Sequence, residues 1–444
     1  MTEELVVGMR YNVKWRDNKP HPGEIVDIRP WRGTETSSSS SKKASASKSP
    51  FDMEYYIHYP GFDRRLDEWV GLDRIEWKAG PIGKASSDSD SMGTASSLNH
   101  KHAFGGAVSQ KSLDLKRKRT GTVDLSADKE VQLAEKNAAI ARLEKEAEEI
   151  TKVKNIPKIV MGKFEVNTWY YSPYPEEYYG AEMYVCEFCL KYMKEKSTLV
   201  RHTAKCTRCE PPGKLIYKEE KVAMFELDGV DHKIYCQNLC LLSKLFLDHK
   251  TLYYDVDPFM FYVLCEVSPI GYHVVGYFSK EKQSADNNLA CILTFPQYQR
   301  KGYGKLLISI SYELTKREGT TGSPEKPLSD LGKISYRSYW AYVIGEALLA
   351  TYNDAKISVT GIQKMTGIKY DDVLSTLHAM GLLKAWKGQH LISVTKEFLD
   401  DQKKRGLKMR LCDPGCLTWE PPIKTDSDKD HGKASRGGNS GARL

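Results

Sequence analysis

The spacing of cysteine and histidine residues between positions 186 and 209 constrains the fold of this chain more than any other feature. Cys186-x2-Cys189 followed by His202-x3-Cys206 has the spacing of a structural, tetrahedral zinc site. A competing pattern of four cysteines exists, because Cys206-x2-Cys209 also lies at a suitable distance from the first pair. The segment is therefore predicted to bind zinc through one of two ligand sets.

Apolar residues between these positions distinguish the two sets. Met193 and Leu199 occupy the places of the small core in a ββα finger. The helix of such a finger presents His202 and Cys206 on one face, one turn apart. We therefore favour a structural zinc ion held by Cys186, Cys189, His202 and Cys206, with Cys209 as a spare thiol.

Length and composition set the broad class of the protein. A chain of 444 residues exceeds a single hydrophobic core, so two or three domains are expected. Lys and Arg number 66 against 58 Asp and Glu, a net charge of +8 that mildly favours an acidic partner such as chromatin. No apolar run approaches the ~20 residues needed to cross a bilayer, and no signal peptide is evident. We expect a soluble intracellular protein whose 10 cysteines are metal ligands, catalytic thiols or core residues.

Residues 1–80 have the pattern of a small, strongly curved β-barrel. Short runs rich in aromatic and β-branched residues, at Met9–Trp15, Glu24–Ile28 and Tyr55–Tyr59, are separated by turn residues. The segment 34–50 is rich in Ser and Lys and is predicted to be a disordered insertion in this barrel.

Residues 81–155 have the composition of a linker. Within it, Lys116–Arg119 is a run of four cations that suits either an import receptor or a solvated surface. Ala127–Ile150 places apolar residues on one helical face, which fits a short partner-binding helix or a solvated one.

Residues 156–422 are predicted to form a large α/β domain. Strand-like runs at Phe259–Val267, His273–Phe278 and Leu289–Phe295 precede a helix that begins near Gly302. Further on, Val359–Leu383 has the pattern of two short helices, followed by a strand, which is typical of a winged helix. Packing against the core is favoured over nucleic-acid binding for this region, and the tail 423–444 is predicted to be disordered.

The loop between Phe295 and the predicted helix suits a pyrophosphate group. Free backbone N–H groups at the positive end of a helix bind phosphates, and Gly302 and Gly304 allow close approach. Arg300, Lys301 and Lys305 add positive charge. Gly-x-Gly alone also fits an ordinary strand-to-helix turn, but the whole string Gln299-Arg300-Lys301-Gly302-Tyr303-Gly304 is much more specific.

That string resembles the acetyl-coenzyme A (acetyl-CoA) signature of acetyltransferases with a GNAT-like core. The flanking segments Leu247–Tyr254, Gly276–Lys282 and Ser323–Asp330 resemble the MYST histone acetyltransferases, and the resemblance covers about residues 156–422. The N-terminal barrel is similar to the chromo-barrel of the MYST branch that includes the yeast essential acetyltransferase, the animal MOF protein and plant members. The insertion at 34–50 departs from the barrel pattern.

The resemblance implies a GNAT-like α/β core with a zinc finger at 184–209, an acetyl-CoA-binding core at 210–350 and a winged-helix-like region at 356–400. It implies that Glu325 is the general base, that Cys291 lies beside the thioester, and that Lys250 is an autoacetylated lysine. Its implied acetyl-CoA contacts are Ile292, Leu293, Thr294, Gln299, Arg300, Lys301, Gly302, Tyr303, Gly304, Lys305, Ser329 and Ser338.

The chemistry of lysine acetylation explains why a base is needed. Only about one lysine in 2,500 is unprotonated at pH 7. A carboxylate at Glu325 with a raised pKa serves as the base for direct transfer, whereas a lone Glu between two prolines is more often a surface residue. A thiolate at Cys291 offers a ping-pong route, although its apolar neighbours also fit a small core residue. We favour direct transfer; Lys250 is, alternatively, a solvated loop cation.

Partners and location follow from the same resemblance. It implies a nuclear enzyme that acetylates histone tails in nucleosomes, histone H4 above all, within a multiprotein complex. Aromatic residues of the barrel suit either a methyl-lysine cage or the barrel core, and nucleic-acid binding is a further possibility for this domain. These residues are Tyr11, Trp15, Tyr55, Tyr56 and Trp69. The rival function is a non-catalytic chromatin adaptor, which would need neither Glu325 nor an intact phosphate loop.

Overall fold

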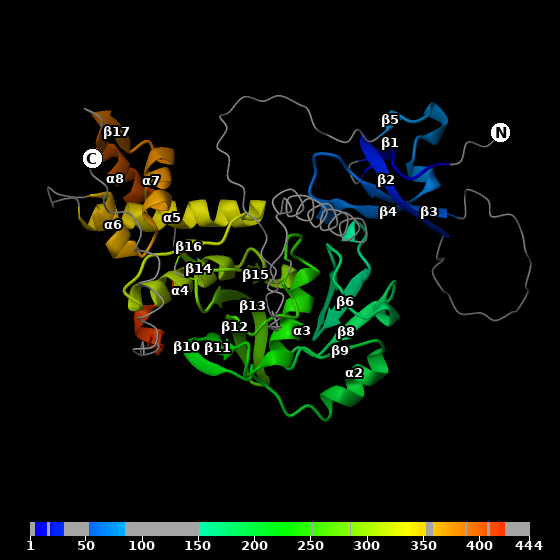
Figure 1. Ribbon diagram of the computed structural model, residues 1–444, viewed down its shortest axis with the longest axis horizontal. Helices are drawn as coiled ribbons and strands as arrows, with labels where there is room; N and C mark the ends of the chain where they lie inside the picture. The colour runs from blue at the N-terminus through cyan, green and yellow to red at the C-terminus, as the bar shows by residue number, and fades with distance from the viewer. Residues whose placement is uncertain are drawn as a thin grey trace, which may run out of the picture. The chain divides into compact units, whose positions relative to one another are not determined.

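The protein is described by a computed structural model that divides into two compact units, residues 1–153 and 154–444 (Figure 1). The described residues are 5–15, 18–30, 53–84, 151–250, 252–284, 286–351, 358–386, 389–405 and 409–421. The insertion at 34–50, the basic run Lys116–Arg119, the predicted helix at Ala127–Ile150 and the tail 423–444 lie outside these ranges. Each unit is described by itself below.

The first unit is a five-stranded antiparallel sheet in the order β4-β3-β2-β1-β5. Its strands are β1 (Met9–Lys14), β2 (Pro20–Pro30), β3 (Met53–His58), β4 (Glu68–Gly71) and β5 (Gly83–Lys84). The register between β2 and β3 shifts at Ile25 and Asp27, and such a bulge increases the twist of a sheet. Short 3-10 turns, η2 (Arg64–Leu66), η3 (Leu72–Arg74) and η4 (Trp77–Ala79), follow β3 and β4. The predicted barrel is confirmed.

The aromatic residues proposed for a methyl-lysine cage divide between the barrel core and its surface. Tyr11 and Tyr55 belong to the hydrophobic core of the barrel. Tyr56, the next residue on β3, is also buried but faces the other side of the strand, where its ring centroid lies 5.2 Å from that of Trp69. Trp15 instead contacts Tyr59, with ring centroids 5.4 Å apart. Alternation along the strands thus divides the five aromatics between two faces, and methyl-lysine binding by this domain stays a prediction.

The second unit begins with a four-stranded sheet in the order β7-β6-β8-β9. Its strands are β6 (Lys158–Met161), β7 (Phe164–Asn167), β8 (Glu182–Val185) and β9 (Tyr192–Met193), and η5 (Glu176–Tyr178) lies between β7 and β8. Helix α2 (Lys196–Thr203) follows β9. The order β8, β9 and α2 is the predicted ββα finger.

A second, larger sheet forms the centre of this unit, in the order β10-β11-β12-β13-β15. These strands are β10 (Lys214–Glu219), β11 (Val222–Asp228), β12 (Phe259–Ser268), β13 (Gly271–Glu281) and β15 (Ile292–Thr294). Helices α3 (Lys233–Lys244) and α4 (Tyr303–Arg317) bury their apolar residues in the same core as the strands (Figure 1). The predicted α/β class is confirmed.

The run Leu289–Phe295, predicted as one strand, is divided in the structure. β14 (Asn287–Leu289) pairs in parallel with β16 (Ser323–Pro324), whereas β15 pairs with β13. Apolar composition alone cannot show that the two halves of a run have different partners. Cys291, the candidate thiol, lies in the break between the two strands.

The C-terminal helices form a separate hydrophobic cluster with one face of α4. The elements are α5 (Asp330–Ala350), α6 (Val359–Thr366), α7 (Tyr370–Ala379), β17 (Leu383–Trp386), β18 (Gln389–Ile392) and α8 (Lys396–Arg405). Gly367 ends α6 with a φ of +73°, the left-handed conformation that glycine adopts easily. The predicted helix-turn-helix with a wing is therefore present, and it packs against the core as expected.

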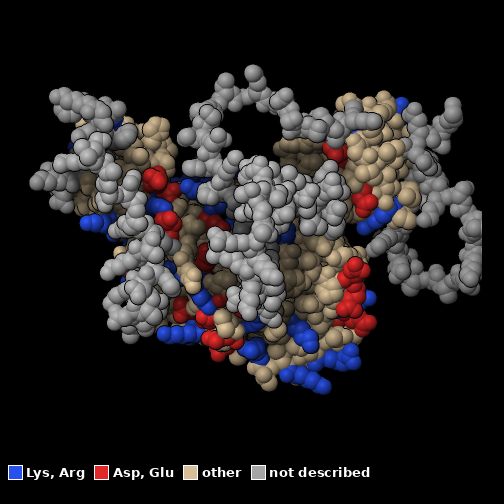
Figure 2. Space-filling model, viewed as in Figure 1, with Lys and Arg blue, Asp and Glu red and all other residues tan. Residues whose placement is uncertain are grey.

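The chain then returns to the central sheet through η7 (Pro414–Cys416). Leu417 forms a bridge with Tyr217 at the β10 edge, and the Trp419 indole donates a hydrogen bond to Glu226 at 2.6 Å. Acidic and basic side chains are interspersed over the face shown in Figure 2. Among the described residues, no helix combines the length and apolar character required to span a bilayer.

Candidate functional site

The finger brings four metal-ligating side chains together. The turn after β8 carries Cys186 and Cys189, and α2 with the residues that follow it carries His202 and Cys206. One ligand atom from each of the four lies within 4.8 Å of the others, and Cys189 Sγ is 3.2 Å from His202 Nε2. Three thiols and an imidazole in this arrangement fit a tetrahedral zinc ion.

The competing ligand Cys209 is exposed and does not belong to this group of described residues. Its carbonyl oxygen instead accepts a hydrogen bond from the Tyr272 amide at 2.7 Å, which ties the segment after the finger to β13. Met193 is buried as predicted. The geometry thus favours the ligand set with His202.

The predicted phosphate loop forms a sharp turn between β15 and α4. The short turn η6 (Pro296–Tyr298) follows β15, and the side chain of Gln299 donates a hydrogen bond to the carbonyl of Thr294 at 2.9 Å. Arg300 has a φ of +63° and Gly302 a φ of +86°, directly before α4 begins. The first amides of α4 have no partner within the helix, so they are available to an anion at its positive end.

Two side chains of this loop contact the protein itself. Tyr303 is buried, and its hydroxyl donates a hydrogen bond to Glu266. The ammonium of Lys305 donates to the carbonyl of Ser335 and the hydroxyl of Ser338 on α5, and desolvation lowers its pKa to about 8. In this structure Lys305 therefore joins α4 to α5. The loop presents its backbone groups and the side chains of Arg300 and Lys301. Lys301 Nζ also lies 5.2 Å from the centre of the Tyr298 ring.

The serines predicted to contact the cofactor both lie on or beside α5. Ser329 is the N-cap of α5, and its hydroxyl accepts a hydrogen bond from the Gly332 amide at 3.1 Å. Ser338 lies farther along α5, where it meets Lys305. The side chain of Lys305 therefore links the start of α4 to the second and third turns of α5.

Cys291 is held by hydrogen bonds to the neighbouring strand. Its carbonyl accepts from the Ser279 amide at 2.8 Å, and its own amide donates to the Ser279 hydroxyl at 3.2 Å. Its thiol lies 3.8 Å from the ammonium of Lys250. Lys250 is only 8% exposed, so it is not the solvated loop cation that its sequence context also allowed.

The electrostatic surroundings of Lys250 combine two opposite effects. Burial lowers the pKa of this lysine, but Tyr277, Cys291 and Cys240 attract its positive charge and raise the pKa overall. The direction of this shift favours the protonated form of Lys250, whose Nζ atom lies beside the Cys291 thiol.

Glu325 is placed next to this region by a backbone hydrogen bond. Its amide donates to the carbonyl of Leu289 at 2.8 Å, continuing the pairing of β16 with β14. The residue is exposed by surface area, yet partial desolvation and the nearby charge of Glu281 raise the pKa of its carboxyl group, while Lys250 lowers it. A carboxyl with a raised pKa is a better proton acceptor at neutral pH than an ordinary one.

Sequence reasoning did not identify every residue that shapes the site. Ser279, Tyr277 and Cys240 surround Cys291 and Lys250 through hydrogen bonds or charge. Tyr277 and Ser279 lie on β13, inside the segment Gly276–Lys282 but without an assigned role, and Cys240 lies on α3, outside the motifs. The alternation of β13, which points every second residue to one face, places Tyr277 and Ser279 together, whereas no sequence signal indicated Cys240.

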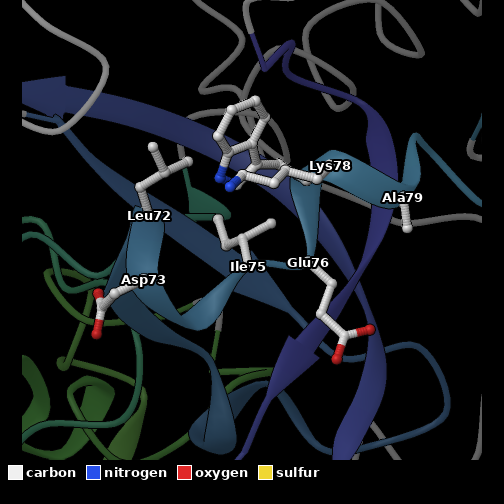
Figure 3. Close-up of a pocket in the computed structure, with 7 residues that line it drawn as sticks. Leu72, Asp73, Ile75, Glu76, Lys78 and Ala79 are labelled. Atoms are coloured by element: carbon white, nitrogen blue, oxygen red, sulfur yellow. The ribbon is translucent and has the colours of Figure 1, made fainter.

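The barrel contains a separate hollow of about 420 Å³. η3 and η4 line it, and in Figure 3 Leu72 and Ile75 point to one side whereas the carboxylates of Asp73 and Glu76 point to the other. None of the residues predicted to bind acetyl-CoA lines this hollow.

The chain matches three sequence families. Residues 210–415 match the MOZ/SAS family, and residues 153–206 match the MYST family zinc finger domain. Residues 5–77 match the Tudor-knot family, described as the RNA binding activity-knot of a chromodomain.

Relatives match over nearly the whole chain. A MYST-like histone acetyltransferase of Oryza sativa subsp. japonica is 46% identical over 94% of this chain and 85% of its own length. Histone acetyltransferase of the MYST family 2 from Arabidopsis thaliana is 45% identical over 94% and 86%, respectively. Histone acetyltransferase MOF of Drosophila melanogaster is 41% identical over 91% of this chain and 53% of its own length.

An α/β core with this strand–turn–helix loop, preceded by a zinc finger, defines an acetyltransferase that uses acetyl-CoA and carries structural zinc. The identity and coverage of the relatives show that the chain belongs to the MYST family. The predicted family, fold class and cofactors are thereby confirmed.

Proposed function

We propose that this enzyme transfers the acetyl group of acetyl-CoA to the side-chain amine of histone lysines, with Glu325 as the general base. The observation that supports this most is the position of Glu325, bonded through its backbone to Leu289, two residues from Cys291. Its pKa is raised in the direction that proton abstraction needs. The relatives named histone acetyltransferases support histones as the substrate class.

The reaction needs one proton transfer and one acyl transfer. Glu325 accepts a proton from the lysine ammonium, and the free amine attacks the thioester carbonyl. The carbon–sulfur bond then breaks, and coenzyme A leaves as a thiolate that takes up a proton. Only the C–N bond is formed, so the direct route requires no acyl-enzyme.

The residues between β15 and α4 are proposed to hold acetyl-CoA. Backbone groups of Ile292, Leu293 and Thr294 lie on β15, which begins directly after the break, and the acetyl and pantetheine end would bind there. The loop Gln299–Lys305 would hold the pyrophosphate with its free amides, while Arg300 and Lys301 supply charge. Ser329 and Ser338 would add contacts from α5; for Lys305 and Tyr303 the backbone, rather than the engaged side chain, is the proposed contact.

Cys291 offers the rival, ping-pong mechanism. In that route the Cys291 sulfur would attack the thioester, and the ammonium of Lys250 lies 3.8 Å from it. The same lysine is the proposed site of autoacetylation, because it is buried next to the acetyl-binding strand. Direct transfer remains our proposal, since it uses Glu325 and needs Cys291 only as a packing residue.

We further propose a nuclear enzyme that acts on nucleosomes, with histone H4 as the preferred substrate and additional subunits as partners. The Tudor-knot barrel is proposed to bind either methyl-lysine or nucleic acid. A non-catalytic adaptor is the opposing hypothesis. It would need neither Glu325 nor the phosphate loop, and a measurement of acetyl-CoA binding to the protein distinguishes the two.

The test is mass spectrometry of recombinant nucleosomes incubated with acetyl-CoA and either the wild-type enzyme or Glu325→Gln. We expect acetyl groups on H4 lysines with the wild-type protein and at least about 100-fold less with the variant. Acetylation confined to another histone would overturn the H4 assignment. Acetylation of no histone would overturn the proposed function.

A further inference from the structure

The winged-helix region is joined directly to the segment that carries Glu325. The turn between α6 and α7 forms a parallel bridge in which Ile368 pairs with Gly322. The Gly322 amide donates to the Gly367 carbonyl at 2.9 Å, and the Lys369 amide donates to the Gly322 carbonyl at 3.1 Å. The turn thus adds a third strand-like partner to the pair β14–β16.

Side chains reinforce this junction on both edges. Gln363 Nε2 donates to Thr321 Oγ1 at 3.1 Å, and Lys369 Nζ donates to Asp286 Oδ1 at 2.8 Å. Thr321 directly precedes the bridged glycine, and Asp286 directly precedes β14. The region α6–α7 therefore holds the two strands whose ends carry Glu325 and Cys291.

Asp372 is the buried charged residue of this junction. It lies in the first turn of α7, is only 5% exposed, and has an Oδ2 atom without a hydrogen-bond partner among the described residues. The hydroxyl of Ser323 is likewise buried without a well-formed hydrogen bond. Burial raises the pKa of Asp372, whereas Ser323 and the Lys326 charge, whose Nζ lies 3.9 Å from Oδ1, lower it.

These two contacts lie on either side of the proposed base, because Ser323 precedes Glu325 by two residues and Lys326 follows it. The exposed pair with Lys326 is long and contributes little by itself. The contact between Ser323 and Asp372 is buried, unlike the pair with Lys326. Burying a polar atom without a hydrogen-bond partner costs free energy, so the surrounding structure must hold these two side chains in place.

We propose that Asp372 is a positioning residue for Glu325, and that the winged-helix region supports the catalytic segment. Its carboxylate faces Ser323 and Lys326 and fixes the path of the chain between them, so that the Glu325 carboxyl stays where the substrate amine arrives. The proposal rests on the proposed role of Glu325 as the base.

A simpler role for Asp372 is to stabilise the start of α7, where acidic residues interact favourably with the helix dipole. Asp371 occupies the same first turn and is exposed. Both carboxylates would interact favourably with the helix dipole, but only Asp372 is buried next to Ser323. Asp371→Asn is therefore a matched control for Asp372→Asn.

The experiment is a double-mutant cycle on the full-length enzyme. The kcat and the KM for each substrate are measured by varying that substrate while the other is saturating. We expect Asp372→Asn to lower kcat by roughly 10- to 100-fold with little change in either KM, because small displacements of a reacting group have effects of this size. Asp371→Asn should behave as the wild type. In the Glu325→Gln background, Asp372→Asn should cause no further loss, since a residue that acts through Glu325 has nothing left to position.

Two results would overturn the proposal while leaving Glu325 as the base. One is that Asp372→Asn behaves as Asp371→Asn; the other is an equal loss of kcat with and without Glu325. Wild-type kcat in Glu325→Gln would instead refute the base itself, and this inference with it. If Asp372→Asn does not fold, Ser323→Ala, which removes only the facing hydroxyl, takes its place in the same cycle and is judged by the same outcomes.

Discussion

Replacing the two glycines of the phosphate loop by alanine should separate fold stability from cofactor binding. Gly302 has a φ of +86° and a ψ of −4°, and a Cβ atom there would lie 3.3 Å from the Cβ of Arg410. A left-handed conformation costs an L-residue about 1–2 kcal/mol. Gly304 lies within the first turn of α4, where a Cβ would meet only Thr294 Oγ1, at an ordinary 3.6 Å.

The two variants should therefore change the free energy of unfolding in different directions. Gly302→Ala should lower it by about 1–2 kcal/mol, which for a unit of this size lowers the Tm by roughly 2–8 °C. Gly304→Ala should leave the Tm unchanged or raise it slightly, because alanine has the higher helix propensity.

Gly304→Ala should weaken the binding of coenzyme A although it does not destabilise the fold. A Cβ there has room, because it meets only Thr294 Oγ1 at 3.6 Å, and we expect the added methyl group to stand where the pyrophosphate approaches the backbone. Loss of well-formed hydrogen bonds to a charged group costs about 1.5–3 kcal/mol, or roughly 10- to 100-fold in Kd. Gly302→Glu and Gly304→Glu, which add negative charge, should abolish binding.

Thermal unfolding of the full-length protein and isothermal titration with coenzyme A provide the two measurements. The reasoning is refuted if Gly304→Ala binds coenzyme A as tightly as the wild type. It is refuted equally if Gly302→Ala is as stable as the wild type, because the left-handed turn would then impose no cost.

Two further results are expected from changes elsewhere in the catalytic unit. Cys206→Ser and His202→Ala should lose the zinc ion and become insoluble, because binding of a structural zinc contributes about 10–16 kcal/mol to the free energy of folding. Cys209→Ser should keep one zinc per chain, as measured by metal analysis. The reverse pattern would favour the four-cysteine site. Glu281→Gln should shift the acid limb of the kcat profile to lower pH, because the charge of Glu281 raises the pKa of Glu325 and only the deprotonated Glu325 is active. An acid limb at the same or a higher pH would contradict the interaction between Glu281 and Glu325.

Features encoded by local sequence were predictable. The spacing of Cys186 to Cys206 and the apolar Met193 predicted a finger, because ligand geometry and a small core are set within one short segment. The string Gln299–Gly304 predicted a strand–turn–helix loop for the same reason: glycine conformation and helix termini are local properties.

Features that depend on distant pairing were not predictable. The division of Leu289–Phe295 into two strands follows from the pairing of β14 with β16, a strand that comes after α4 in the chain. The contact of Lys305 with α5 and the burial of Asp372 beside Ser323 likewise depend on tertiary packing, of α4 against α5 and of α7 against β16. Hydrophobic periodicity reports which face of an element is buried but not which residues meet there.

The most direct test of the account compares Glu325→Gln and Cys291→Ala as folded, zinc-loaded proteins in initial-rate experiments with both substrates varied. We predict intersecting reciprocal plots for the wild type, substantial activity in Cys291→Ala, and a kcat at least about 100-fold lower in Glu325→Gln. The deficit of Glu325→Gln should shrink as pH rises, because more lysine deprotonates without help. Parallel plots, together with an acetylated Cys291 that histone discharges at a competent rate, would contradict direct transfer with Glu325 as the base.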